Sequence, residues 1–143
     1  MYETMLFLHI VGAVGMGIYA VLPFIVGKFK QLSGAAQEGL ASGLVAAGRI
    51  GQYALVIQLL TGGYLVSNGG GEYAVSWMIL VVVVFLALGA LSGIVQGPLK
   101  KIVSAAANAQ NASASITKVQ TISAIIFILF LVVIWLMTNP WFK

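Results

Sequence analysis

The chain contains no cysteine and few charged residues, and both features limit the classes of protein to which it can belong. Without cysteine it has no disulfide, no thiolate metal site and no cysteine nucleophile. Only 7% of its 143 residues are charged, whereas a soluble domain carries about 25%. So few charges cannot coat a soluble globule, and the net charge of +4 is better explained by membrane topology than by nucleic acid. We therefore expect most of the surface to face the lipid bilayer.

Four apolar runs fill most of the chain, at about residues 4–26, 50–66, 73–96 and 116–137. A bilayer core needs about 20 apolar residues per helix, and each run is close to that length. The first run lacks the basic leader of a signal peptide, so it is interpreted as a span. The predicted fold class is all-α: one domain over residues 1–143, forming an antiparallel four-transmembrane-helix bundle. The SNGGG sequence at residues 67–71 predicts a tight turn between the second and third helices.

The basic residues predict the orientation of the bundle. The first and third loops carry basic residues, whereas the short connection between the second and third helices carries only Glu72. By the positive-inside rule, the two basic loops are cytoplasmic and both termini lie outside. The six loop residues are Lys28, Lys30, Arg49, Lys100, Lys101 and Lys118.

Polar chemistry within the spans is scarce. None of the four runs contains an acidic residue, so we do not expect a carboxylate proton relay, and a transporter is the weakest of the functions considered. The single histidine, His9, has no acidic partner in the membrane, which excludes a hydrolase triad. An imidazole at that depth costs free energy unless its nitrogens are paired, so His9 is the leading candidate for a functional residue.

Three interpretations of His9 remain open. As a neutral imidazole it could ligate haem b or copper, it could contact a quinone or another ligand, or it could be a structural hydrogen-bonding group. Met16, Arg49 and Gln58 are the other candidates for a cofactor site. Each also has a structural interpretation: Met16 in helix packing, Arg49 as an anchor at the lipid headgroups, and Gln58 in an interhelical hydrogen bond. Met78, on another helix, is better placed than Met16 to reach across a ring.

Glycine and proline add further expectations about the helices. Gly89, Gly93 and Gly97 repeat every four residues, which predicts a close-packing seam for a membrane-protein partner or a second copy of the chain. Pro23 is expected to bend the first helix, and Pro98 to end the third. Residues 31–48 are small and mildly polar, and they could form an interfacial helix or extend the second helix.

Several short motifs resemble a group of small four-helix bacterial membrane proteins. The group includes the copper-resistance D-like domain, a predicted integral membrane protein family, and the haem-binding bacterial protoporphyrinogen IX oxidase. In the oxidase a helix-one histidine ligates haem, so the resemblance implies that role for His9 and a location in the bacterial cytoplasmic (inner) membrane. The motifs are Leu8-His9-Ile10, Pro23, Arg49, Thr61-Gly62, Ser76-Trp77 and Pro98-Leu99-Lys100.

Two hypotheses about function follow. In the first, the protein binds haem or takes part in redox or metal handling through His9. In the second, it is a non-catalytic accessory subunit or assembly factor of a larger, respiratory-type membrane complex, docked through the glycine seam.

Overall fold

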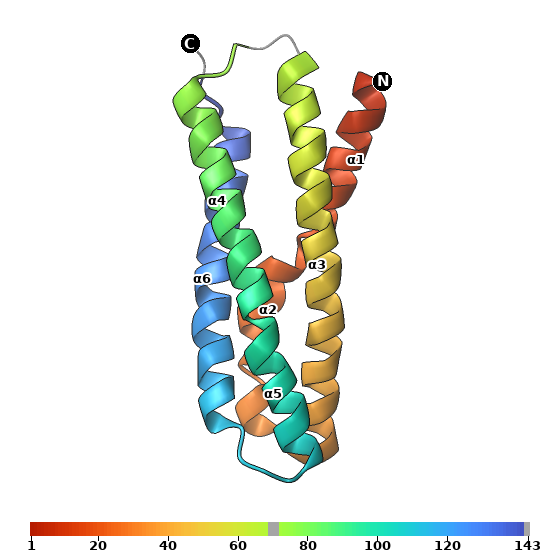
Figure 1. Cartoon of the computed structure of the whole chain (residues 1–143), viewed down its shortest axis with the longest axis vertical. Helices are drawn as coiled ribbons and strands as arrows, with labels where there is room; N and C mark the ends of the chain where they lie inside the picture. The colour runs from red at the N-terminus through yellow and green to blue at the C-terminus, as the bar shows by residue number, and fades with distance from the viewer. Residues whose placement is uncertain (69–71, 142–143) are drawn as a thin grey trace.

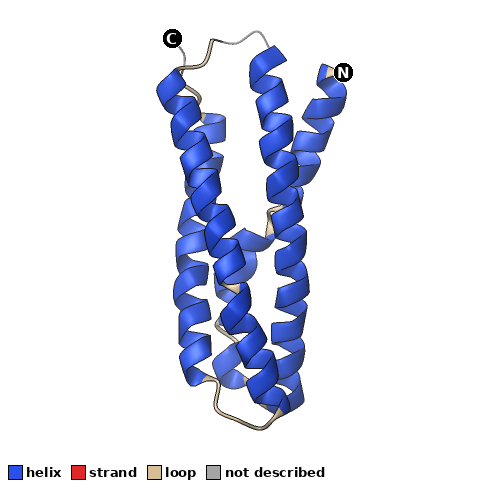
Figure 2. Ribbon diagram, in the orientation of Figure 1, coloured by secondary structure: helices blue, strands red, loops and turns tan. Residues whose placement is uncertain are grey.

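The computed structural model describes residues 1–68 and 72–141, and its regular elements are helices (Figure 2). They form four spans that are long and apolar enough to cross a membrane, as the all-α prediction requires. Only 22–28% of the residues in the most apolar window of each span are buried within the protein, which leaves a large apolar surface available to lipid. The chain is therefore a multi-pass membrane protein. The elements are α1 (Tyr2–Gly15), α2 (Ile18–Val26), the 3-10 helix η1 (Phe29–Gln31), α3 (Gly34–Asn68), α4 (Val75–Ile94), α5 (Gln96–Ala107) and α6 (Ser113–Thr138).

The start of α1 and the end of α6 lie at the same end of the bundle, which we call the upper end as it is drawn in Figure 1. At this end the backbone N–H of Ala74 donates to the carbonyl oxygen of Trp141 at 2.8 Å, which ties the chain end to the start of α4. The lower end holds η1 and the connection between α5 and α6 (Figure 1). Residues 69–71 of the expected SNGGG turn lie outside the described residues.

The first span is interrupted at Met16 and Gly17. Two glycines flank Met16, and glycine is a weak helix former, so the chain can turn there at low cost. Above the interruption α1 packs against α3, and below it α2 packs against α6 (Figure 1). The sequence predicted one helix over residues 4–26 with a bend at Pro23. The single helix was wrong, because the span is divided into α1 and α2; Pro23 lies inside α2, which continues to Val26.

The second span is much longer than the predicted helix at residues 50–66. α3 contains 35 residues, which corresponds to about 52 Å at 1.5 Å per residue. Its lower half is rich in alanine, has no proline, and packs against α5. Residues 34–48 therefore extend the second helix, which was one of the two interpretations of this segment.

The third span continues past Pro98, whereas the sequence predicted that the helix would end near residue 96. α4 ends at Ile94 and a new helix, α5, begins at Gln96. Pro98 consequently lies in the first turn of α5. In that turn a backbone N–H has no intrahelical acceptor, so the missing N–H of proline is not a defect.

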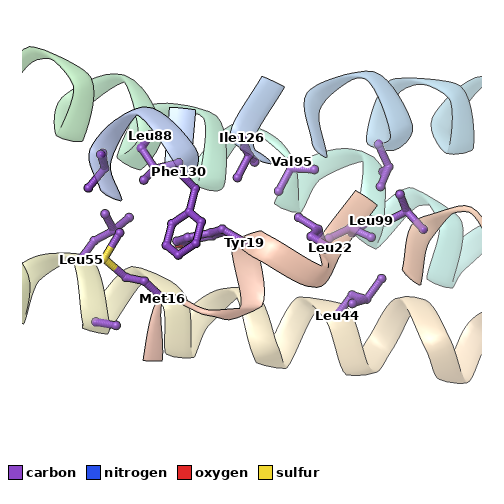
Figure 3. Packing of buried hydrophobic residues seen from close by; sticks show 14 of the residues in the cluster. Met16, Tyr19, Leu22, Leu44, Leu55, Leu88, Val95, Leu99, Ile126 and Phe130 are labelled. Atoms are coloured by element: carbon purple, nitrogen blue, oxygen red, sulfur yellow. The ribbon is translucent and has the colours of Figure 1, made fainter. Parts of the chain in front are cut away.

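The spans meet around an apolar core in the middle of the bundle (Figure 3). Met16, Tyr19, Leu88 and Ile126 are each at most 1% exposed. The rings of Tyr19 and Phe130 pack edge to face with centroids 6.4 Å apart, which joins α2 to α6. This core holds α2, the lower part of the first span, against α6, whereas α1 above it packs against α3.

The glycines of the predicted seam are not used to pack helices within the chain. A Cβ atom added at Gly89 or Gly97 would meet nothing within 4 Å, and one added at Gly93 would meet only the side chain of Gln52 at 3.7 Å. Gly93 and Gly97 are exposed, and Gly89 is half-buried. The seam therefore lies on the outside of the bundle.

Candidate functional site

A cavity of about 480 Å³ opens in the upper half of the bundle. It lies there because α1 follows α3 while α4 packs with α6, so the four spans close fully only below the interruption at Met16 (Figure 1). All four spans contribute side chains to its wall, and most of these are apolar or aromatic. Among them are His9 from α1, Gln58 from α3, Trp77 and Met78 from α4, and the flexible side chain of Met137 near the end of α6.

His9 is held in this wall by a hydrogen bond to α3. Its Nδ1 lies 2.8 Å from Oγ1 of Thr61. The Thr61 hydroxyl has one proton, which it donates to the carbonyl oxygen of Ile57 at 2.7 Å. Toward His9 the hydroxyl therefore accepts, and Nδ1 is the protonated nitrogen. The neutral imidazole then carries a free lone pair on Nε2, the nitrogen through which histidine commonly binds metals.

Gly62 provides the space for the imidazole ring. A Cβ atom at this position would lie 3.3 Å from Cε1 of His9 and 3.8 Å from Nδ1. Thr61 and Gly62 thus act together, because the first fixes the ring by its hydroxyl and the second lets the ring approach the helix. A metal-binding histidine is usually oriented in this way by a hydrogen bond from its second nitrogen.

One turn below Thr61, the Gln58 side chain reaches toward α1. Gln58 is 6% exposed, and its Oε1 is buried without a hydrogen-bond partner. The same oxygen would lie 2.5 Å from a Cβ added at Gly12, so the absence of a side chain at Gly12 makes room for the amide. Gln58 also lines the cavity, although its unpaired Oε1 is itself buried against α1.

Trp77 and Tyr73 form the opposite wall. Their rings are stacked with centroids 5.1 Å apart and an interplanar angle of 20°. Nε1 of Trp77 donates to the carbonyl oxygen of Leu136 at 3.0 Å, which fixes the indole between α4 and α6. The aromatic wall is therefore rigid, and the thioether groups of Met78 and Met137 add flexible side chains to the same cavity.

The structure brings two of the four sequence-predicted site residues together. His9 and Gln58 both line the cavity. Met16 does not; it is 1% exposed and packs in the core beside Leu55 (Figure 3). Arg49 is exposed on α3, twelve residues or about 18 Å below Thr61, and it is not part of the cavity. Among residues 1–68 and 72–141 no cluster of three or more His, Asp or Glu side chains could hold a metal ion.

Sequence reasoning did not assign roles to Thr61, Trp77 or Met137. Thr61 was noted only within the Thr61-Gly62 motif of the resemblance, because its partner is 52 residues away in the chain. Trp77 was noted only within the Ser76-Trp77 motif, and Met137 only as the last residue of the fourth apolar run. A polar pair spaced three residues apart on an apolar helix, as Gln58 and Thr61 are, was the one available signal.

Comparison with known proteins places the chain in a family. No curated protein and no solved structure matches it. Residues 3–140 match the family described as "Predicted integral membrane protein (DUF2269)". This match covers nearly the whole chain, including every span except its first residue, Tyr2, and the cavity residues His9, Gln58, Trp77, Met78 and Met137. The chain therefore belongs to this family of predicted integral membrane proteins.

Proposed function

We propose that the protein binds haem b in the upper cavity, where Nε2 of His9 would hold the iron, and that it takes part in redox or metal handling in the bacterial cytoplasmic membrane. The observation that carries this proposal is the bond from Nδ1 of His9 to Thr61, because it leaves Nε2 free in the wall of a cavity. His9 could equally donate its lone pair to copper, but the size and aromatic wall of the cavity favour a large flat ligand.

The cavity suits such a cofactor in size and in chemistry. Sites for cofactors and other small molecules have volumes of about 300–1,000 Å³ and are mostly apolar with a few polar groups. Met78 and Met137 stand on spans other than that of His9, and either thioether would be able to supply a second ligand if haem were bound. Bound haem would supply one-electron chemistry, which the side chains of this chain cannot perform themselves.

The proposal is tested by the reduced-minus-oxidised absorption spectrum of the protein purified in mild detergent. We expect haem bands in the wild-type protein, their loss in His9→Ala, and their retention in Met16→Leu, a volume-conserving change in the core below the cavity. Thr61→Val keeps the shape of the residue and removes the hydroxyl, and we expect haem affinity to fall about 10–100-fold. Haem bands of full intensity in His9→Ala would refute the proposal.

The open glycine face supports a second candidate, an accessory subunit or assembly factor of a larger membrane complex. Gly89 and Gly97 offer a surface without side chains, which would let another transmembrane helix approach closely. Replacing both with leucine is expected to release a co-purifying partner or second copy, whereas Gly43→Leu on the open face of α3 is the matched control. Purification of the wild-type protein as a lone monomer in mild detergent would count against this role.

A further inference from the structure

The wall of the upper cavity has a gap between α3 and α4. In the lower half of the bundle the second and third spans are close, and Nε2 of Gln96 donates to the carbonyl oxygen of Val45 at 3.3 Å. Toward the upper end the two spans diverge (Figure 1). There Leu59 on α3 and Val82 on α4 both line the cavity, and they are 43% and 42% exposed. Side chains that line a cavity and also reach the outer surface mark the edges of an opening.

Gly63 keeps this gap open because it has no side chain. It lies one turn above Leu59 on the same side of α3, and it also lines the cavity. Gly63 is exposed, and a Cβ atom added there would meet nothing within 4 Å. A Cβ atom at the neighbouring Gly62 would instead lie 3.3 Å from Cε1 of His9. The two glycines therefore differ in role, since Gly62 makes room for the imidazole and Gly63 leaves space between α3 and α4.

The gap lies at the depth of the lipid chains. Leu59 is nine residues below the end of α3 at Asn68, which is about 13.5 Å along the axis. Val82 is seven residues below the start of α4 at Val75, which is about 10.5 Å. The headgroup region on each side of a bilayer is only about 5–8 Å thick. Helices that end at the aqueous surface therefore place both edges of the gap in the hydrocarbon of the upper leaflet.

We propose that the upper cavity opens sideways into the upper leaflet, between α3 and α4, and takes its ligand from the lipid phase. The ligand is then a lipid-soluble molecule that passes Gly63 to reach His9 and Gln58. Most of the cavity wall is apolar, so an apolar molecule gains free energy by entering it. The route leads to the cavity of the proposed haem site, but it does not depend on haem being the ligand.

Trp77 can report what enters the cavity, because it lines the wall and a hydrogen bond to Leu136 fixes its indole. The chain has three tryptophans, so Trp135→Phe and Trp141→Phe leave Trp77 as the single one. This parent protein, freed of any bound cofactor, is placed in vesicles of phosphatidylcholine with brominated acyl chains. We expect bromine to quench the fluorescence of Trp77, although its side chain is only 5% exposed. Iodide dissolved in the water should quench it far less.

Two substitutions that narrow the gap decide the route. Gly63→Leu fills the open space on α3, and Val82→Phe enlarges the side chain at the edge formed by α4. Each is expected to remove most of the quenching by brominated lipid. Gly43→Leu, at an exposed glycine of the same helix where a Cβ atom also meets nothing within 4 Å, is the matched control and should leave the quenching unchanged.

Two results would overturn the proposal. One is bromine quenching that is as strong in Gly63→Leu and Val82→Phe as in the parent protein. The other is stronger quenching by iodide than by brominated lipid, which would indicate entry from the water past Tyr2 and Ser67, two residues that line the cavity near its aqueous end.

This measurement is separate from the haem spectrum, since it uses protein without a cofactor. Absence of haem bands together with quenching that depends on Gly63 would refute haem as the ligand and support the lipid route. Haem bands that are lost in His9→Ala, without such quenching, would support the haem site and refute the route.

Discussion

Replacing Gly51 with valine is expected to destabilise the bundle by about 3 kcal/mol or more, so that little folded protein is recovered. A Cβ atom at this position would lie 2.7 Å from the Tyr19 hydroxyl oxygen, 2.8 Å from Cζ of Tyr19 and 3.0 Å from Cγ2 of Ile18. Valine adds two further methyl groups to this contact. The Tyr19 ring cannot withdraw, because it is rigid and packed against Phe130. The variant must therefore push α2 away from α3.

The matched control for this change is Gly43→Val in the same helix. Gly43 is exposed, and a Cβ atom there would meet nothing within 4 Å. We expect its free energy of unfolding to change by less than about 0.5 kcal/mol. Yield of monodisperse protein and Tm measure both variants, and equal behaviour of the two would show that α2 does not pack on Gly51 as described.

The second large effect is expected at Trp77. Its replacement with alanine should lower the free energy of unfolding by about 3–5 kcal/mol. Trp77 is 5% exposed, stacks on Tyr73 and donates to the carbonyl oxygen of Leu136. Its removal leaves a hole between α4 and α6 and a carbonyl group without its donor. Trp77→Phe keeps most of the ring and loses the N–H group. We therefore expect this variant to lower the free energy of unfolding by only about 1 kcal/mol.

Trp135→Ala serves as the control for Trp77, because the Trp135 side chain is 54% exposed toward the surroundings. We expect it to lower the free energy of unfolding by less than about 1 kcal/mol. Unfolding of the three variants in one detergent compares them directly. If Trp135→Ala were the more damaging change, the assignment of Trp77 to the packed wall would be wrong.

The spans could be predicted from the sequence because lipid imposes a simple rule on length and polarity. Four runs of about 20 apolar residues with few charges are typical of a polytopic membrane protein and of little else. The lower half of α3 was harder to assign, since residues 34–48 are neither clearly apolar nor charged, and it is packing against α5 that makes them continue the helix.

Proline and glycine were weaker guides to the interruptions. Pro98 predicted an end to the third helix, but it lies in the first turn of a new helix, where proline is tolerated. Gly12, Gly15 and Gly17 cluster around the turn at Met16, but such glycines are equally typical of close helix packing, so they did not predict the interruption. The chain turns there because the upper part of the span packs on α3 and the lower part on α6, a tertiary effect that local sequence does not carry.

The candidate site was predictable only in part. His9 stood out because it is the single histidine, and Gln58 because an amide in the middle of a span must point inward. The partner of His9 could not be read from the sequence, since Thr61 lies on another helix and its hydroxyl also bonds its own backbone. Met16 was a candidate for the same cofactor site as His9, but the interruption of the helix turns its side chain into the core, where it is 1% exposed.

The central claim is that His9 keeps its proton on Nδ1 and offers an unprotonated Nε2 to the cavity. Because the chain has one histidine, protein labelled with ¹⁵N-histidine gives a single pair of ring nitrogen signals, which nuclear magnetic resonance can assign. In protein freed of any bound cofactor we predict a protonated Nδ1 and a bare Nε2, with loss of this preference in Thr61→Val. A proton on Nε2 with a bare Nδ1, or an imidazolium with both nitrogens protonated, would contradict the account.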